Sequence, residues 1–204
     1  MPANATRPLV IIGAFAASLV VGLSLMFLMM GGGRNIAAPA AIGGPFQLTD
    51  QGGAVVTEQS LQGRPTLIFF GFTHCPEFCP TTVYELTGWM NKIDPDKSRI
   101  QAYFISIDPE RDTPQILGAY LANATDRITG ISGDPAKVQA MARGFKVYFK
   151  KVPTDPAKPD GDYTMDHMAS VFLLDKQGRF TGTIAYGENP DIAEQKIKNL
   201  IARD

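Results

Sequence analysis

The sequence has few of the side chains that build metal clusters and lacks the positive charge of a nucleic-acid binder. Its 204 residues include only two cysteines and two histidines. A four-ligand structural zinc site would therefore need all of Cys75, Cys79, His74 and His167. Lys and Arg number 19 against 20 for Asp and Glu, and no basic cluster is present. We therefore expect no nucleic-acid partner.

One long stretch near the N-terminus lacks charge altogether. Residues Leu9 to Met30 contain no charged side chain, and a membrane-spanning helix needs about 20 such residues. A cleaved signal peptide usually has a shorter apolar region of about 7–15 residues, and Ala38-Pro39-Ala40 is only a loose match to its cleavage site. We predict a short tail at residues 1–8 and a single-pass transmembrane anchor at residues 9–30.

The segment after this stretch differs in composition from the rest of the chain. Residues 31–44 are rich in Gly, Ala and Pro and have little to bury, which predicts a flexible linker. The remainder, residues 45–204, is long enough for one globular domain. Its alternation of apolar runs with helix and turn signals predicts an α/β fold, a thioredoxin-like mixed sheet flanked by helices.

Both cysteines follow the most apolar run of this domain. Leu67 to Phe70 predicts a buried strand that ends at Gly71. Pro80 is favoured in the first turn of a helix, so we expect a helix to begin just after Cys79. The two thiols would then lie at a strand-to-helix junction, where ligands and reactive groups collect in α/β sheets.

The spacing of Cys75 and Cys79 allows two kinds of chemistry. Cys-x-x-x-Cys places both sulfurs on one side of a helical turn, where they can share a metal or close a disulfide. Two thiolates and one imidazole suit Cu(I), a soft ion that accepts few ligands. A structural disulfide in an exported chain is an equal alternative from the spacing alone.

The other elements are predicted from local patterns. A hairpin is expected around the turn at residues 50–53, and a second one around the turn at residues 176–179. Further strands are expected at residues 100–107, 128–132 and 147–152, and residues 153–162 should form a surface loop. Helices should begin at three residues that each precede a proline, namely Thr113, Asp134 and Asn189, and Gly144 should close the second of these helices.

Three segments together resemble the Sco/SenC family of copper-binding assembly factors for cytochrome c oxidase. They are Phe72–Thr82, Ser106–Pro114 and Asp162–His167. The resemblance implies a thioredoxin-like domain that binds copper, as Cu(I) and also as Cu(II), through Cys75, Cys79 and His167. The chain departs from the family at Glu77, where Asp is commoner, and at Met168, where a small hydroxylated residue is usual; neither change removes a ligand.

The resemblance also implies a function and partners. We expect a membrane-anchored metallochaperone that delivers copper to the dinuclear centre of oxidase subunit II, with an upstream periplasmic copper carrier as a further partner. The dithiol favours an oxidising compartment, so the domain is expected in the periplasm and its anchor in a bacterial inner membrane. The alternative is a thiol:disulfide oxidoreductase that uses Cys75 and Cys79 to reduce the subunit's cysteines and does not require His167.

Several residues near these motifs are weaker candidates for binding copper or supporting its ligands. His74 is the poorer of the two histidine candidates, because the family ligand is the distal one. Asp108 could orient a ligand or contact a partner, although helix capping explains it as well. Asp166 is expected to be a solvated carboxylate, and Met165 and Met168 are more often packing residues than sulfur ligands.

Overall fold

The computed structural model describes residues 6–30 and 42–203, and it describes side chains of the N-terminal helix for residues 13–26 only. The described residues fall into two compact units, divided after residue 40. Residues 1–5 of the predicted tail and 31–41 of the predicted linker lie outside the description.

The first unit is helix α1, Thr6–Met30. It begins three residues before the predicted anchor at Leu9. Within the described part of the chain, no helix combines the length and the apolar character of a membrane span.

The second unit contains the remaining elements in alternating order. These are β1 (Gln47–Asp50), β2 (Val55–Thr57), the short 3-10 helix η1 (Glu58–Leu61), β3 (Thr66–Gly71), α2 (Phe78–Ile93), β4 (Gln101–Ser106), α3 (Pro114–Ala122), β5 (Ile128–Ser132), α4 (Pro135–Gly144), β6 (Phe149–Pro153), β7 (Tyr163–His167), β8 (Ser170–Leu174), β9 (Phe180–Ala185) and α5 (Pro190–Ala202).

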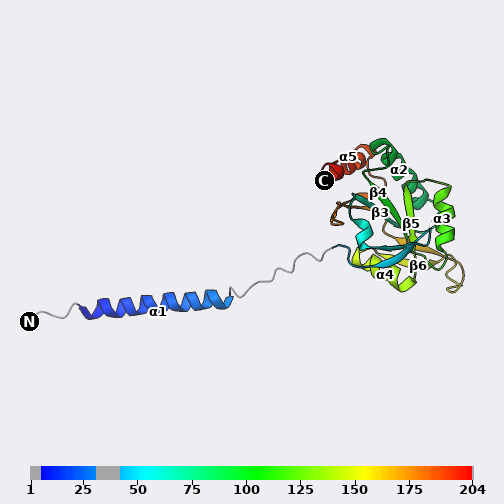
Figure 1. The fold of residues 1–204 in the computed structure, drawn as a ribbon. Helices are drawn as coiled ribbons and strands as arrows, with labels where there is room; N and C mark the ends of the chain where they lie inside the picture. Colours follow the sequence, from blue (N-terminus) through cyan, green and yellow to red (C-terminus); the bar gives the residue numbers. More distant parts are fainter. Residues whose placement is uncertain (1–5, 31–41, 204) are drawn as a thin grey trace, which may run out of the picture. The chain divides into compact units, whose positions relative to one another are not determined.

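A seven-stranded mixed sheet organises this unit (Figure 1). Its order is β2-β1-β5-β4-β3-β8-β9, with β3, β4 and β5 parallel to one another and the other pairs antiparallel. Every residue of β3 is buried, as expected for a strand covered on both faces. The thioredoxin-like mixed α/β fold predicted from the sequence is confirmed.

Successive phenylalanines of β3 show which helices cover which face. The ring of Phe69 packs edge-on against Phe104, which contacts Tyr120 of α3, whereas Phe70 contacts Phe145 at the end of α4. Because successive strand residues point to opposite faces, α3 and α4 lie on opposite sides of the sheet. Buried apolar side chains fill both layers.

The helix starts agree with the prediction. Thr113, Asp134 and Asn189 each accept hydrogen bonds from backbone N–H groups in the first turn, and each is followed by proline at the first helical position. Helix α2 begins at Phe78, slightly earlier than predicted, so Cys79 lies in its first turn.

The predicted role of Gly144 is wrong. Gly144 is the last residue of α4, and the left-handed conformation that closes the helix occurs at Lys146, with φ of 60°. The Val147 N–H then bonds to the Ala142 carbonyl at 2.8 Å, as in a Schellman motif. Close packing favours glycine at position 144 instead, because a Cβ there would lie 3.0 Å from the Gly43 carbonyl oxygen.

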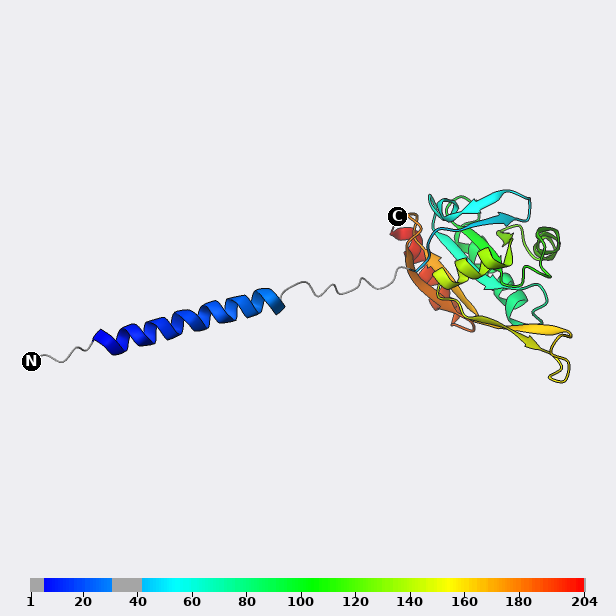
Figure 2. The same cartoon turned by 90° about the horizontal axis from the view of Figure 1, so that it is seen from below.

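The sequence patterns did not reveal β7. This strand pairs with β6 in a separate antiparallel ribbon, which extends beside the main sheet (Figure 2). The predicted strand at residues 147–152 corresponds to β6, which starts two residues later. His167 is the last residue of β7, so this ribbon decides where the imidazole lies.

Candidate metal centre

A tight turn after β3 carries the first cysteine. The Cys75 N–H bonds to the Phe72 carbonyl at 3.3 Å, closing the turn across Thr73 and His74. Cys75 is only 7% exposed, and its sulfur accepts a hydrogen bond from the Cys79 N–H at 3.3 Å. The turn therefore directs the Cys75 sulfur towards the start of α2.

The second cysteine is fully buried beneath this turn. Cys79 lies in the first turn of α2, and its sulfur packs against the end of β3 at Gly71. A Cβ at Gly71 would lie 2.9 Å from the Cys79 sulfur and 2.9 Å from carbons of Phe69 and Phe104. Glycine is therefore required at the end of β3 to make room for the thiol.

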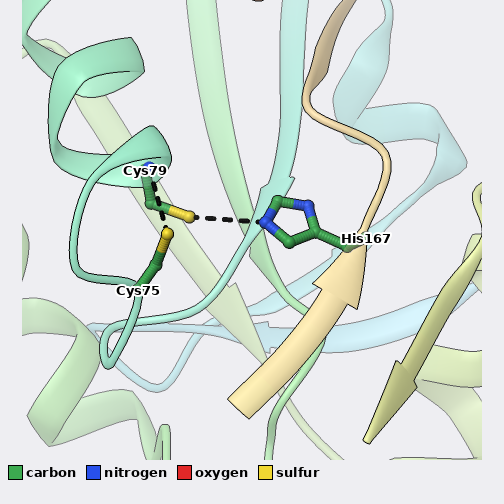
Figure 3. Close-up of side chains that lie close together, drawn as sticks. All are labelled: Cys75, Cys79 and His167. Carbon is green, nitrogen blue, oxygen red and sulfur yellow. Dashed lines mark hydrogen bonds between the residues drawn. The ribbon is translucent and has the colours of Figure 1, made fainter. Parts of the chain in front are cut away.

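The third side chain comes from far along the sequence. The His167 ring, at the end of β7, points to the two sulfurs, with Nε2 3.7 Å from Cys79 Sγ (Figure 3). The two sulfurs and a ring nitrogen all lie within 4.8 Å of one another. The structure thus brings together all three residues that the family resemblance implied.

The orientation of the imidazole is fixed by its other nitrogen. His167 Nδ1 lies 3.1 Å from the backbone carbonyl of Met168. Because a carbonyl can only accept, Nδ1 carries the hydrogen, and in the neutral ring Nε2 keeps its lone pair. The rings of Phe69 and Phe72 pack edge-on against the imidazole at centroid distances of 6.3 and 5.7 Å.

The two thiols differ in acidity. A hydrogen bond from Cys79, opposed by burial and assisted by backbone N–H groups, lowers the pKa of Cys75 to about 4. The same hydrogen bond and burial raise the pKa of Cys79. The metal-free pair therefore holds one thiolate, at Cys75, and one proton, at Cys79.

These donor atoms suit a soft ion of low coordination number. Two donors that each lie about 2.0–2.3 Å from one ion can be at most about 4.6 Å apart. The 3.7 Å between Cys79 Sγ and His167 Nε2 meets that condition. Two sulfurs and one imidazole match the preference of Cu(I), and the described residues add no fourth Cys, His, Asp or Glu to the group.

The other candidates lie outside this group. His74 has a 54% exposed side chain, Asp166 and Met168 are exposed, and Met165 is buried in the core. Asp108 is 1% exposed and binds the Arg111 guanidinium and the Tyr163 hydroxyl. Its predicted influence on the ligands stays a prediction.

Sequence reasoning missed two contributions to the site. Arg111 donates to the Tyr163 carbonyl at 2.8 Å and so joins the loop after β4 to the first residue of β7. Gly71 provides the space for Cys79. Gly71 carried a usable signal, since a glycine that ends a wholly apolar strand often marks a close approach, whereas nothing local linked Arg111 to Tyr163.

Comparison with known proteins places this architecture in a family. The SCO1/SenC family model matches residues 34–202. The mitochondrial protein SCO2 of Saccharomyces cerevisiae is 39% identical over 162 residues, which cover 79% of this chain and 53% of that protein, so the chain spans about half of its length. The SCO2-like protein of Rickettsia prowazekii is 34% identical over 185 residues, or 88% of this chain and 89% of its own.

Solved structures give the same result. ScoI of Bradyrhizobium japonicum with copper bound is 48% identical, with a TM-score of 0.71, and the match covers 78% of this chain and 99% of that one. ScoI of Arabidopsis thaliana with copper bound is 33% identical, with a TM-score of 0.73 and coverage of 80% and 100%. This chain belongs to the SCO1/SenC family.

Proposed function

We propose that this chain is a copper metallochaperone for the assembly of cytochrome c oxidase. The observation that carries the proposal is the convergence of Cys75, Cys79 and His167 within 4.8 Å, from elements far apart in the sequence. The copper-bound structures of ScoI from two organisms support copper as the cargo.

The chemistry of the three side chains suits reversible binding. Cys75 presents a thiolate, Cys79 releases its proton when the ion binds, and His167 offers the Nε2 lone pair. Three ligands leave the shell of the ion open, so a ligand of the recipient enters before those of the donor leave. Oxidation to a Cys75–Cys79 disulfide removes both thiolates, so loading requires the reduced pair.

The proposed recipient is the dinuclear copper centre of oxidase subunit II, and a periplasmic carrier is proposed to supply the ion. Helix α1 is proposed to anchor the domain in a bacterial inner membrane, with the copper site in the periplasm. The support is the uncharged sequence at residues 9–30, and the described side chains of α1, at residues 13–26, are all exposed. A chain without residues 1–41 should leave the membrane fraction of lysed cells; retention there would contradict the anchor.

The ligand set is tested by titrating Cu(I) against a competing chelator in the reduced protein. Cys75→Ser, Cys79→Ser and His167→Ala should each weaken binding by about 100-fold or more, beyond the usual effect of a residue outside the ligand shell. His74→Ala is the matched control, since it removes the other histidine and should bind as the wild type does. Equal affinity in all five proteins would defeat the assignment.

One observation favours the second candidate, a thiol:disulfide oxidoreductase. The pKa of Cys75, lowered to about 4, makes its sulfur a thiolate at neutral pH, as in reactive cysteines. The two functions separate at His167, because thiol exchange does not need an imidazole ligand. If His167→Ala lost copper binding but supported normal oxidase assembly in cells, the oxidoreductase would be favoured; loss of both supports the metallochaperone.

A further inference from the structure

A buried carboxylate with no role in the ligand set lies behind the turn that carries Cys75. The Asp112 side chain is 0% exposed. It accepts hydrogen bonds from the Thr73 N–H at 3.0 Å, the Thr73 hydroxyl at 2.6 Å and the Ser106 hydroxyl at 2.7 Å. Among residues 42–203, its only ion-pair contact is His74, at 3.9 Å. Two of its three hydrogen bonds therefore hold Thr73, directly before His74.

The chain of hydrogen bonds continues from Thr73 to His74. His74 Nδ1 lies 3.1 Å from the Thr73 hydroxyl oxygen. That hydroxyl has one hydrogen, which it donates to Asp112, so it must accept from His74 Nδ1. Nδ1 therefore carries the hydrogen, and in the neutral ring Nε2 keeps its lone pair.

His74 is thus prepared in the same way as the ligand His167. Each imidazole donates from Nδ1 to a fixed acceptor, a carbonyl for His167 and the Thr73 hydroxyl for His74. Such a partner is what orients metal-binding histidines in proteins. The difference is position, since the His74 side chain is 54% exposed and lies outside the group of three ligands.

We propose that His74 is an outer copper ligand, which receives the ion from a donor and passes it to Cys75, and that Asp112 and Thr73 position it. This proposal rests on the copper-binding function proposed above. His74 and Cys75 are consecutive residues of one turn, which joins the exposed imidazole directly to the first sulfur of the buried site. A solvent-exposed ligand is also accessible to a donor that cannot reach the buried Cys79.

The transfer consists of ligand exchange without redox change. Copper stays Cu(I) throughout. His74 Nε2 binds the donor-held ion as one donor ligand leaves, and the Cys75 thiolate then displaces Nε2. Cys79 releases its proton to solvent as its sulfur binds, and His167 Nε2 completes the site. His74 ends unbound, so it changes the rate of loading and not the final affinity.

The test compares rate with equilibrium in the reduced full-length chain. Cu(I) held by bathocuproine disulfonate is mixed with the protein, and the loss of the chelator's colour gives the transfer rate. We expect His74→Ala to load about tenfold more slowly or worse, a typical loss for a residue that supports a metal site. Its affinity at equilibrium should equal that of the wild type. An unchanged loading rate would overturn the proposal, and so would a fall in affinity that matches the fall in rate.

Two variants of Thr73 test the hydrogen bonds that connect Asp112, Thr73 and His74. Thr73→Val removes the hydroxyl and should slow loading, whereas Thr73→Ser keeps the hydroxyl and should load as the wild type does. In the metal-free protein, ¹⁵N spectra of the imidazoles should show hydrogen on Nδ1 of His74 in the wild type and in Thr73→Ser, but a mixture of tautomers in Thr73→Val. Identical rates and spectra in all three proteins would refute the positioning role.

Failure of this inference is distinguishable from failure of the proposed function. If copper is not the cargo, His167→Ala loses Cu(I) binding but still supports normal oxidase assembly in cells. If copper is the cargo but His74 is not an entry ligand, His167→Ala loses affinity while His74→Ala loads at the normal rate.

Discussion

At the scale of single residues, the missing side chain of Gly71 makes room for the Cys79 sulfur. A methyl group at this position would lie 2.9 Å from that sulfur and equally close to two phenylalanine carbons. Each of these neighbours is buried, and well-packed interiors have little space into which they could shift. Any side chain at position 71 would therefore displace either the Cys79 sulfur or the neighbouring phenylalanine rings.

We expect Gly71→Ala to reduce both stability and copper binding. Overpacking a core usually costs about 1–3 kcal/mol, and a displaced Cys79 sulfur would no longer face His167. The matched control is Gly88→Ala, on an exposed face of α2 where a Cβ meets no atom within 4 Å; it should stabilise the helix by up to about 1 kcal/mol. Urea unfolding and Cu(I) competition measure the two effects, and a Gly71→Ala protein with normal Cu(I) affinity would contradict this account.

At the scale of elements, the position of His167 depends on how the β6–β7 ribbon is held. Among the described strands, β6 and β7 pair only with each other, so side-chain contacts with the rest of the domain set the angle of the ribbon. Arg111 stacks 3.8 Å above the Tyr163 ring and donates to the Tyr163 carbonyl, and the Tyr163 hydroxyl donates to the buried Asp108 at 2.8 Å. These contacts fix the first residue of β7, and His167 is the last.

Tyr163→Phe tests this connection, because it removes the hydroxyl and keeps the ring. Removing a hydrogen-bond donor from a buried carboxylate costs about 1–3 kcal/mol of folding stability. We expect this loss of stability, faster hydrogen exchange in β7 and weaker Cu(I) binding. The loss of Cu(I) affinity should be smaller than in His167→Ala. Tyr84→Phe, at an 80% exposed position on α2, should change none of these quantities. Unchanged exchange in β7 of Tyr163→Phe would show that the ribbon is held by other contacts.

A second connection between elements joins the end of α2 to the sheet. Asp94 is 1% exposed and pairs with the buried Arg127 guanidinium at 3.3 Å. Burial opposes its charge, but the N–H groups of Ile100, Arg99 and Ser98, and Arg127 itself, outweigh that effect and lower the pKa of Asp94. A lowered folded-state pKa means that ionised Asp94 stabilises the fold above the ordinary value of 3.8, and that this stability is lost as pH falls through the folded value.

Asp94→Asn should therefore destabilise the domain strongly at neutral pH. Removing one partner of a buried pair typically costs about 3–5 kcal/mol. The difference from the wild type should shrink as pH falls below 3.8, where Asp94 of the unfolded chain takes up a proton, and should be lost as pH falls through the lower pKa of the folded state. Asp96→Asn, at an exposed position nearby, should change the unfolding free energy by less than about 0.5 kcal/mol. A difference that stays constant from pH 7 to pH 2 would contradict the role of the charge.

The elements that the sequence predicted well are those with local signals. The starts of α3, α4 and α5 follow from a capping residue and a proline side by side, and β3 follows from an unbroken apolar run. Strand β7 has no such signal, because its pattern of exposure, from Tyr163 to His167, depends on a partner strand and on Arg111. The proximity of His167 to the cysteines likewise came from the family resemblance, since no local pattern relates residues 88 positions apart.

At the scale of the whole molecule, the three proposed ligands come from two parts of the domain whose strands do not pair with each other. Cys75 and Cys79 lie beside the main sheet, whereas His167 lies on the β6–β7 ribbon. An ion bound by all three crosslinks these parts in the folded state, and the unfolded chain cannot hold the three ligands together. Binding free energy then appears as folding free energy.

Cu(I) should therefore raise the melting temperature of the reduced protein. A free concentration 100 times the dissociation constant adds about 2.7 kcal/mol, which corresponds to roughly 5–10 °C for a domain of this size. The shift should persist in His74→Ala, whose ligand set is intact, and should be much smaller in His167→Ala, where the ribbon is no longer attached to the ion. Calorimetry under reducing conditions measures it, and equal shifts in His167→Ala and the wild type would mean that the ion is held by the sulfurs alone and does not crosslink the two parts.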